Sequence, residues 1–232
     1  MGRYMADRFI RVNGTGIRYA VEGKGDPVVL LHGNGEDHSL FDTLIPQLTE
    51  AGYLVYAPDS RGHGASDPVD EFHYADMAED IFQFINELGL EKPALYGHSD
   101  GGIIALLLEM HHPGTLGAMA VSGTNLHPKG LISSFIEEFT RINETKQDPL
   151  ITLMLTEPHI DPEDLKKIRI PVLVTAGEND LVRPEETERL TGALPDCRAV
   201  IVEGADHGSY IAGSPRMGEM LLDFLKERWK RD

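Results

Sequence analysis

A serine set between glycines is the first feature of the chain that could do chemistry. Residues 95–102 read LYGHSDGG, and the apolar run IIALLL follows at once. A strand-to-helix turn this tight strains the backbone of Ser99 and points its hydroxyl out of the bend, because a Cβ at Gly97 or Gly101 would clash. The helix that follows directs unpaired N–H groups towards that hydroxyl. The spacing therefore predicts a nucleophilic serine.

Two later loops could activate that serine. The loop after the apolar run 171–176 offers an acid, Asp180. The loop after the run 198–202 offers a base, His207. A serine hydroxyl is a weak nucleophile unless an imidazole removes its proton, and a buried carboxylate must hold that imidazole in one tautomer. The pattern predicts a catalytic triad in the chain order Ser99, Asp180, His207, with Glu178 and Asp206 as competing acids.

An oxyanion hole is predicted from two backbone N–H groups, those of Asn34 and Asp100. Asn34 lies in a His-Gly-Asn turn after an apolar run, and Asp100 follows the serine. Loss of one such donor typically costs about 3 kcal/mol. The Asp100 carboxylate must avoid the developing negative charge, because like charges about 5 Å apart at an effective dielectric of about 20 repel by about 3 kcal/mol. It therefore either joins a neutralised structural network or meets a cation in the acyl pocket.

Alternating strands and helices must position these loops. Continuous apolar runs such as PVVLL are typical of parallel strands that are buried on both faces. The pattern predicts a hairpin over 9–14 and 17–23, strands over 27–31, 53–57, 93–96, 116–122, 171–176 and 198–202, and helices over 40–51, 74–88, 184–193 and 215–229, with a further helix directly after the serine. We expect an α/β fold whose mostly parallel sheet is covered on both faces. Ligands then bind outside the carboxyl ends of the strands.

The strand–helix alternation stops between residues 124 and 168. This stretch carries apolar residues at helical spacing, which exceed what a solvated connection needs. We predict a core domain of residues 1–123 and 169–232 and a small helical cap of residues 124–168, with a long crossover as the alternative. The residues predicted to bind substrate are Asp100, Gly33, Phe135, Met154 and Leu181.

These motifs together resemble those of the α/β-hydrolase family, over essentially the whole chain. The family places a His-Gly loop, a D-x-R-G-x-G-x-S loop, G-x-S-x-G, a late Asp and a C-terminal Gly-x-x-His in this order. The chain has matching residues at His32, 59–66, 97–101, Asp180 and 204–207. The resemblance implies the fold and Asp180 as the acid. It does not fix the substrate, since the family includes esterases, lipases, C–C hydrolases, lyases and non-enzymatic receptors.

The aspartate after the serine narrows the resemblance. A Gly-x-Ser-Asp-Gly-Gly elbow is similar to that of the biphenyl-hydrolase-like (valacyclovir hydrolase) group, which includes an enzyme of α-amino-acid esters. We expect a carboxylesterase-like serine hydrolase of small esters, extending to α-amino-acid esters if Asp100 binds the amine. A C–C bond hydrolase or lyase and a non-catalytic ligand receptor are the alternatives.

Composition sets the remaining expectations. The chain has 232 residues, of which 41% are hydrophobic, and this suits one sizeable domain. Its formal net charge of −17 disfavours nucleic acid and anionic membranes as partners. A single cysteine, Cys197, and an N-terminal segment Met1–Asp7 without an apolar signal core favour the cytoplasm. We expect a small-molecule ester as the partner, a monomer or homodimer, no cofactor and no metal.

Overall fold

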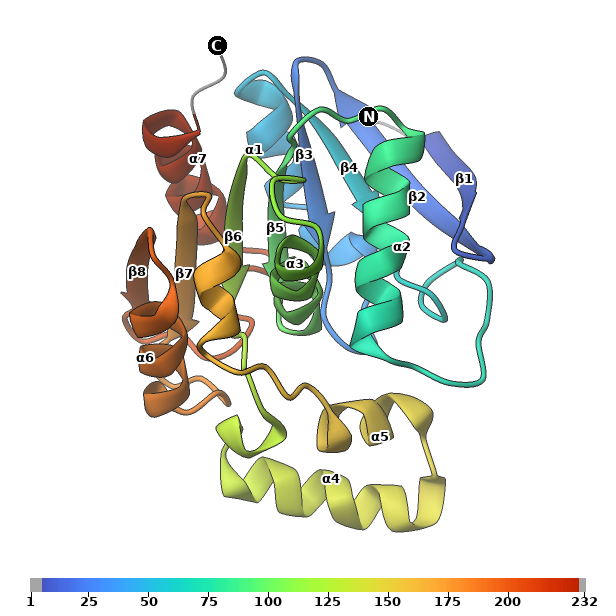
Figure 1. Ribbon diagram of the computed structural model, residues 1–232, viewed down its shortest axis with the longest axis vertical. Coiled ribbons are helices and arrows are strands. Elements are labelled where there is room, and N and C mark those ends of the chain that lie inside the picture. The colour runs from blue at the N-terminus through green and yellow to red at the C-terminus, as the bar shows by residue number, and fades with distance from the viewer. Residues whose placement is uncertain (1–5, 230–232) are drawn as a thin grey trace.

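The apolar runs of the chain pair side by side into one sheet. The computed structural model describes residues 6–229, so most of the segment Met1–Asp7 lies outside the described residues. The eight strands found there are β1 (Ala6–Val12), β2 (Thr15–Gly23), β3 (Asp26–Leu31), β4 (Tyr53–Pro58), β5 (Ala94–His98), β6 (Ala118–Ser122), β7 (Val172–Gly177) and β8 (Cys197–Val202). Their order is β1-β2-β4-β3-β5-β6-β7-β8, and the pairs β1/β2 and β2/β4 are antiparallel while the others are parallel (Figure 1).

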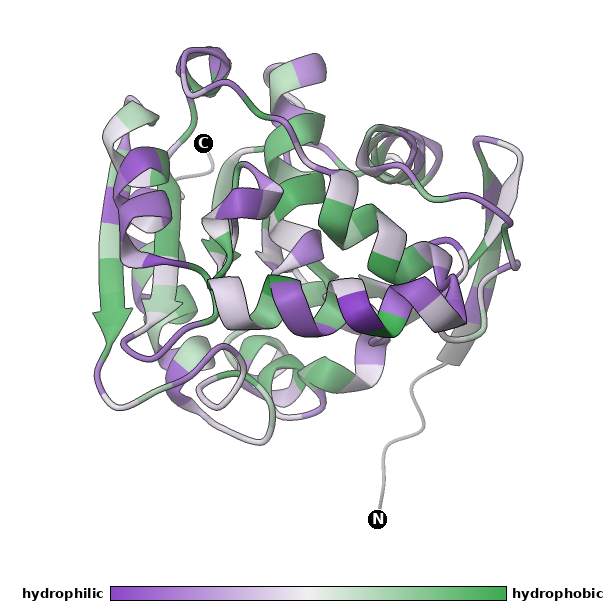
Figure 2. Ribbon diagram, turned by 90° about the horizontal axis from the view of Figure 1, so that it is seen from below, coloured by the Kyte–Doolittle hydropathy of each residue, from purple (hydrophilic) through white to green (hydrophobic). Residues whose placement is uncertain are grey.

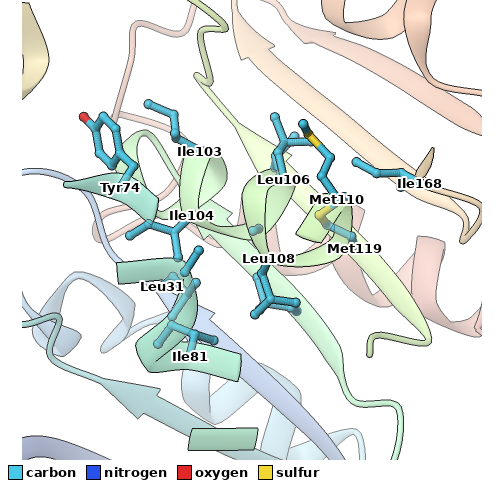
Figure 3. Close-up of a cluster of buried hydrophobic side chains, with 14 of the residues drawn as sticks. Leu31, Tyr74, Ile81, Ile103, Ile104, Leu106, Leu108, Met110, Met119 and Ile168 are labelled. Atoms are coloured by element: carbon cyan, nitrogen blue, oxygen red, sulfur yellow. The ribbon is translucent and has the colours of Figure 1, made fainter. Parts of the chain in front are cut away.

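Helices cover both faces of the sheet, because alternate residues of a buried strand point in opposite directions. The covering helices are α1 (Leu44–Glu50), α2 (Tyr74–Glu87), α3 (Asp100–His111), α6 (Pro184–Ala193) and α7 (Arg216–Arg228). Val29 and Leu31 pack towards α2, α3 and α6, whereas Val28 and Leu30 pack towards α1 and α7. Figure 3 shows part of the first cluster, with Leu31 close to Ile81 of α2 and Ile104 of α3. Within residues 6–229, no helix has the length and apolarity that a bilayer crossing requires.

The predicted fold class is confirmed, and one predicted helix is wrong. The span 40–51 forms a 3₁₀ turn, His38–Phe41, followed by the separate helix α1. Pro46 explains the break, because proline lacks the N–H of a helical hydrogen bond and its ring clashes with the carbonyl of residue i−4. It is tolerated in the first turn of α1, where that N–H has no partner in any case.

The segment between β6 and β7 places two helices beyond the carboxyl ends of the parallel strands. Its elements are the 3₁₀ turn Pro128–Gly130, α4 (Ser133–Lys146), α5 (Pro149–Thr156) and the 3₁₀ turn Asp164–Lys167. Figure 1 shows α4 and α5 side by side below the sheet, and in Figure 2, which looks from below, they lie in front of it. No residue of α4 is buried, whereas Leu165 and Ile168 belong to the core cluster of α3. Only the middle of the segment therefore stands off the core.

Candidate active site

The turn between β5 and α3 holds Ser99 in a strained conformation. Its φ of 52° and ψ of −116° lie where residues with a Cβ are rarely found. The neighbouring backbone leaves no room for larger residues: a Cβ at Gly97 would lie 2.2 Å from the Gly101 carbonyl oxygen, and one at Gly101 would lie 2.2 Å from that of Leu31. The Ser99 N–H donates to the Ser122 carbonyl at 2.8 Å, which ties the turn to β6. The packed backbone thus holds the serine in place.

A histidine and an aspartate from two later loops meet this serine. His207 Nε2 lies 3.0 Å from Ser99 Oγ, and His207 Nδ1 lies 2.7 Å from Asp180 Oδ1. Gly123 makes space for the ring, because a Cβ there would lie 2.5 Å from His207 Cε1. The three residues proposed from the sequence are therefore joined in one hydrogen-bonded chain, and Gly123 is a supporting position that no motif indicated.

Of the three candidate acids, Asp180 is the one in contact with His207. Its two oxygens also accept the N–H groups of Gly177 and Val182, each at 3.0 Å. Burial opposes ionisation of this carboxyl, but the hydrogen bond from His207 and the backbone donors outweigh it and lower its pKa. Asp180 is therefore ionised over the neutral range. The other candidates face elsewhere: Glu178 accepts the Gly204 N–H, and Asp206 accepts the N–H groups of residues 208 and 209.

A second histidine lies beneath the first. The His98 ring is 4.8 Å from that of His207, and its Nδ1 lies 3.0 Å from Ser122 Oγ. Burial lowers the pKa of His98 to about 3, and the nearby His207 adds to the effect. His98 is therefore neutral and serves as a packed, uncharged floor for the reactive imidazole.

The loop after β3 lies beside the serine. A Cβ on Gly33 would lie 3.1 Å from Ser99 Cβ, so the loop and the elbow are in close contact. Asn34 Nδ2 donates to Asp100 Oδ2 at 3.0 Å, which links the two residues whose N–H groups are predicted to form the oxyanion hole. The Asp100 N–H opens α3, where N–H groups have no intrahelical partner. The arrangement suits an anionic oxygen above Ser99.

A pocket of about 240 Å³ opens above these residues. Ser99, His207 and all five residues predicted to bind substrate line it. Asn34, predicted to belong to the oxyanion hole, also lines it. The lining residues that sequence reasoning missed are Glu36, Tyr74, His98, Asn125, Leu131, Phe139 and Glu157. The stacked rings of Phe135 and Phe139, 4.2 Å apart, form its apolar wall on α4. Helical spacing could have indicated Phe139, but no local signal marks Glu36, Tyr74 or Glu157.

Comparison with known proteins finds family models and relatives that match most of the chain. Residues 26–140 match the family model described as alpha/beta hydrolase fold, and residues 154–228 match one described as TAP-like protein. The chain is 26% identical to the AB hydrolase superfamily protein YisY of Bacillus subtilis, covering 87% of this chain and 92% of that protein. It is 25% identical to the serine hydrolase BPHL of Homo sapiens, covering 94% and 85%. The structure of an esterase from Exiguobacterium antarcticum superposes with a TM-score of 0.83 at 25% identity, covering 94% and 98%.

The chain belongs to the α/β-hydrolase family. The chain is a hydrolase of that family, because its named relatives include a serine hydrolase and an esterase. Its sheet with helices on both faces agrees with this assignment. The resemblance to the group that contains BPHL, inferred from the elbow alone, agrees with the match over most of both chains.

The pocket of this α/β-hydrolase is acidic. Among the described residues that line it, Glu36, Asp100 and Glu157 are carboxylates and none is lysine or arginine. Burial raises the pKa of Glu36 although its Oε2 accepts the Gly33 N–H at 2.9 Å. Burial also raises the pKa of Asp100, against the opposing donors Tyr74 and Asn34. The pocket thus disfavours anionic ligands.

One group of side chains near the site has the donor types of a metal site. Ligand atoms of Asp37, His38 and Asp59 lie within 4.8 Å of one another. The Asp59 oxygens already accept the N–H groups of His38 and Ala65, each at 3.0 Å, and the Arg18 guanidinium lies 3.7 Å away. These contacts satisfy the Asp59 carboxylate and place a cation beside it. We therefore infer that the three side chains hold the loop after β4 in place.

The histidines of the family loops are used structurally. His32 Nε2 accepts the Ser60 N–H at 2.9 Å, and His32 Nδ1 lies 2.8 Å from the Gly33 carbonyl. Burial lowers the pKa of His32 to about 4, so the ring is neutral and joins two loops. His63 Nδ1 lies 2.9 Å from the Arg61 carbonyl in the second of these loops.

Proposed function

We propose that this hydrolase cleaves small carboxylic esters through an acyl-enzyme formed on Ser99. The observation that carries the proposal is the hydrogen-bonded chain from Asp180 through His207 to Ser99, which ends in the pocket. Asp180 accepts the Nδ1–H of His207, and this tautomer leaves the Nε2 lone pair free to act as the base. An ionised and buried acid is what such an arrangement requires.

The reaction proceeds in two halves. Ser99 Oγ attacks the ester carbonyl while His207 Nε2 takes its proton, and the carbonyl oxygen becomes an anion. The imidazolium returns that proton to the alcohol oxygen as the C–O bond breaks, which leaves the acyl group on Ser99. Water then attacks the acyl-enzyme, again giving its proton to His207, and Ser99 leaves with that proton. The released carboxylic acid ionises, and the enzyme is restored.

The oxyanion is stabilised by the backbone N–H groups of Asn34 and Asp100. Both belong to segments held in place, one by contact with Ser99 and the other as the start of α3. Donors that need no reorganisation lower the barrier more than solvent does, typically by about 3 kcal/mol each. Their backbone character means that side-chain substitutions leave the donors themselves intact.

The size and charge of the pocket favour small neutral or cationic esters. A volume of about 240 Å³ bounded by Phe135 and Phe139 suits short acyl chains. The carboxylates that line it disfavour the anionic enoyl acids that a C–C bond hydrolase or lyase processes. An intact triad also disfavours a receptor that has lost turnover. Simple esters are therefore the best-supported substrates.

α-Amino-acid esters remain a narrower form of this proposal, in which Asp100 pairs with the substrate ammonium. In that form Asp100→Asn lowers kcat/KM for an α-amino-acid ester far more than for the matched ester that lacks the amine. Asp100 already accepts a hydrogen bond from Asn34 and is faced by the Tyr74 hydroxyl, so a bound amine would have to displace or share these groups. We therefore favour simple esters as the class.

Covalent labelling tests the proposal. A fluorophosphonate should attach to wild-type protein in a 1:1 ratio at Ser99, and the protein should hydrolyse p-nitrophenyl acetate. Ser99→Ala should lose both properties, whereas Ser133→Ala, a change at the exposed start of α4, should keep them. Labelling without turnover would support the receptor, and faster turnover of a vinylogous diketone than of any ester would support the C–C hydrolase.

A further inference from the structure

Helix α5 is attached to the floor of the site at both ends. Near its start, the Leu150 carbonyl accepts a hydrogen bond from Asn34 Nδ2 at 3.2 Å. Just after its end, Glu157 Oε2 accepts the Tyr74 N–H at 3.1 Å, and Glu157 Oε1 lies 2.7 Å from His73 Nδ1. The attachments use residues of two different core segments, the loop after β3 and the start of α2.

Both attachments lead to the same carboxylate, that of Asp100. The Asn34 amide nitrogen that donates to Leu150 also donates to Asp100 Oδ2 at 3.0 Å. The Tyr74 hydroxyl faces the same carboxylate and favours its ionised form. These contacts form a ring, which runs from Asp100 through Asn34, α5, Glu157 and Tyr74 back to Asp100.

The fixed side of this ring is rigid. Asp100 is 4% exposed and begins α3, whose first turn is packed against backbone atoms of β3. The Tyr74 ring is buried beside Ile103 and Ile104, and Figure 3 shows its hydroxyl pointing away from that cluster. A hydroxyl on a packed ring and a carboxylate on a helix start have little freedom to move. Tyr74 and Asp100 can therefore hold α5, which is less buried, in a fixed position.

Helices α4 and α5 need to be held by such contacts, because few of their residues are buried. α4 has no buried residue, and α5 has only Ile151 and Leu153. An amide with two N–H groups satisfies both Asp100 and Leu150, and a buried carboxylate is costly unless donors of this kind meet it. The Asn34 amide and the Tyr74 hydroxyl also orient the carboxylate of Asp100 and offset its charge, next to a site where negative charge develops.

We propose that Asp100 is a positioning residue, which fixes cap helix α5 and the Asn34 loop relative to the nucleophile rather than binding substrate. The catalytic part of this inference rests on the proposed ester hydrolysis, whereas the structural part does not. Ring closure couples the position of the pocket wall to the two backbone donors of the oxyanion hole. A loosened cap should therefore lower kcat and not only raise KM.

The experiment opens the ring at three points. Asn34→Ala removes an amide but keeps the backbone N–H, Tyr74→Phe removes only a hydroxyl, and Asp100→Asn removes the charge. Each should raise amide hydrogen exchange of residues 149–157 about tenfold and lower kcat by about tenfold, the size expected for loss of one hydrogen bond. The double variant of Asn34 and Tyr74 should be scarcely worse than either single variant, since one break opens the ring.

Matched controls separate the ring from general loosening. Tyr53→Phe, at the opposite end of β4 from the site, and Asn86→Ala, on the exposed side of α2, should change neither quantity. Esters with and without an α-amino group should lose activity equally in all three ring variants. Unchanged exchange in α5, or a loss confined to the amine-bearing ester, would overturn the positioning role. Because exchange needs no substrate, it reports on the ring even if the wild-type protein hydrolyses no ester.

Discussion

The nucleophile elbow and helix α4 lie on opposite sides of one pocket, and they are built in opposite ways. At the elbow, backbone atoms approach so closely that a methyl group at Gly97 or Gly101 would lie 2.2 Å from a carbonyl oxygen. On α4 no residue is buried, and Phe135 and Phe139 reach the pocket from a helix whose residues are all half-buried or exposed. The proposed nucleophile therefore lies where almost no change fits, and the residues proposed to contact substrate lie where many changes fit.

Loss of the reactive groups should give the largest effect. We expect Ser99→Ala and His207→Ala each to lower kcat by a factor on the order of 10³ or more, because each removes a part of one covalent mechanism. The double variant should be scarcely worse, since the residues act as a unit. Steady-state kinetics with p-nitrophenyl acetate measure this, and circular dichroism checks that the variants fold. Full activity in Ser99→Ala would rule out the mechanism.

The elbow glycines should be the most sensitive to stability loss. We expect Gly101→Ala to lower the free energy of unfolding by about 3 kcal/mol or more, because its Cβ would press on the Leu31 carbonyl of a buried strand. Glu138→Ala, on the exposed side of α4, should change it by less than about 0.5 kcal/mol. Urea unfolding measures both, and equal effects would contradict the contrast between the two regions.

The acid should matter more than its neighbour in sequence. Asp180→Asn should lower kcat by at least about 10²-fold in a folded protein, since an amide cannot hold the productive tautomer of His207. Glu178→Gln should be near wild type, because Glu178 only accepts the Gly204 N–H. A large loss in Glu178→Gln with little loss in Asp180→Asn would reverse the assignment.

The buried His98 beneath His207 should make the protein sensitive to acid. Burial lowers the pKa of His98 from 6.5 to about 3, so the unfolded state binds a proton between these values that the folded state does not. His98 therefore destabilises the fold as pH falls below 6.5, by about 1.4 kcal/mol per pH unit, and costs nothing above it. Urea unfolding from pH 7 to 4.5 should show a shallower slope for His98→Asn, whereas the exposed His111→Asn should match wild type.

The cap wall should give the smallest effect on reaction rate. Phe135→Ala should enlarge the pocket and shift the preferred acyl chain to longer esters, while kcat/KM for the acetate changes by less than about tenfold. A series of p-nitrophenyl esters from acetate to laurate measures the shift. Interfacial activation should be absent, and a sharp rise in rate above the critical micelle concentration would contradict a small, fixed pocket.

The alternation of apolar runs was sufficient to predict the fold class and most of its elements. A parallel strand buried on both faces must be apolar throughout, and a tight elbow must be rich in glycine, so both leave clear local patterns. The split of the predicted helix 40–51 depended on Pro46, whose effect on the preceding turn the apolar spacing does not register. Local patterns thus predicted the scaffold, Ser99 and His207, whereas the resemblance to the family selected Asp180 among three candidate acids.

Tertiary structure alone decided what surrounds those residues. Glu36, Tyr74 and Glu157 come from a loop, the start of α2 and the residue after α5, and only the fold brings them to one pocket. The sequence left Asp100 either in a structural network or facing a substrate cation, and the donors that meet it belong to residues 26 and 66 positions away. Contacts over such distances depend on how helices pack on the sheet, which periodicity in a single chain does not specify.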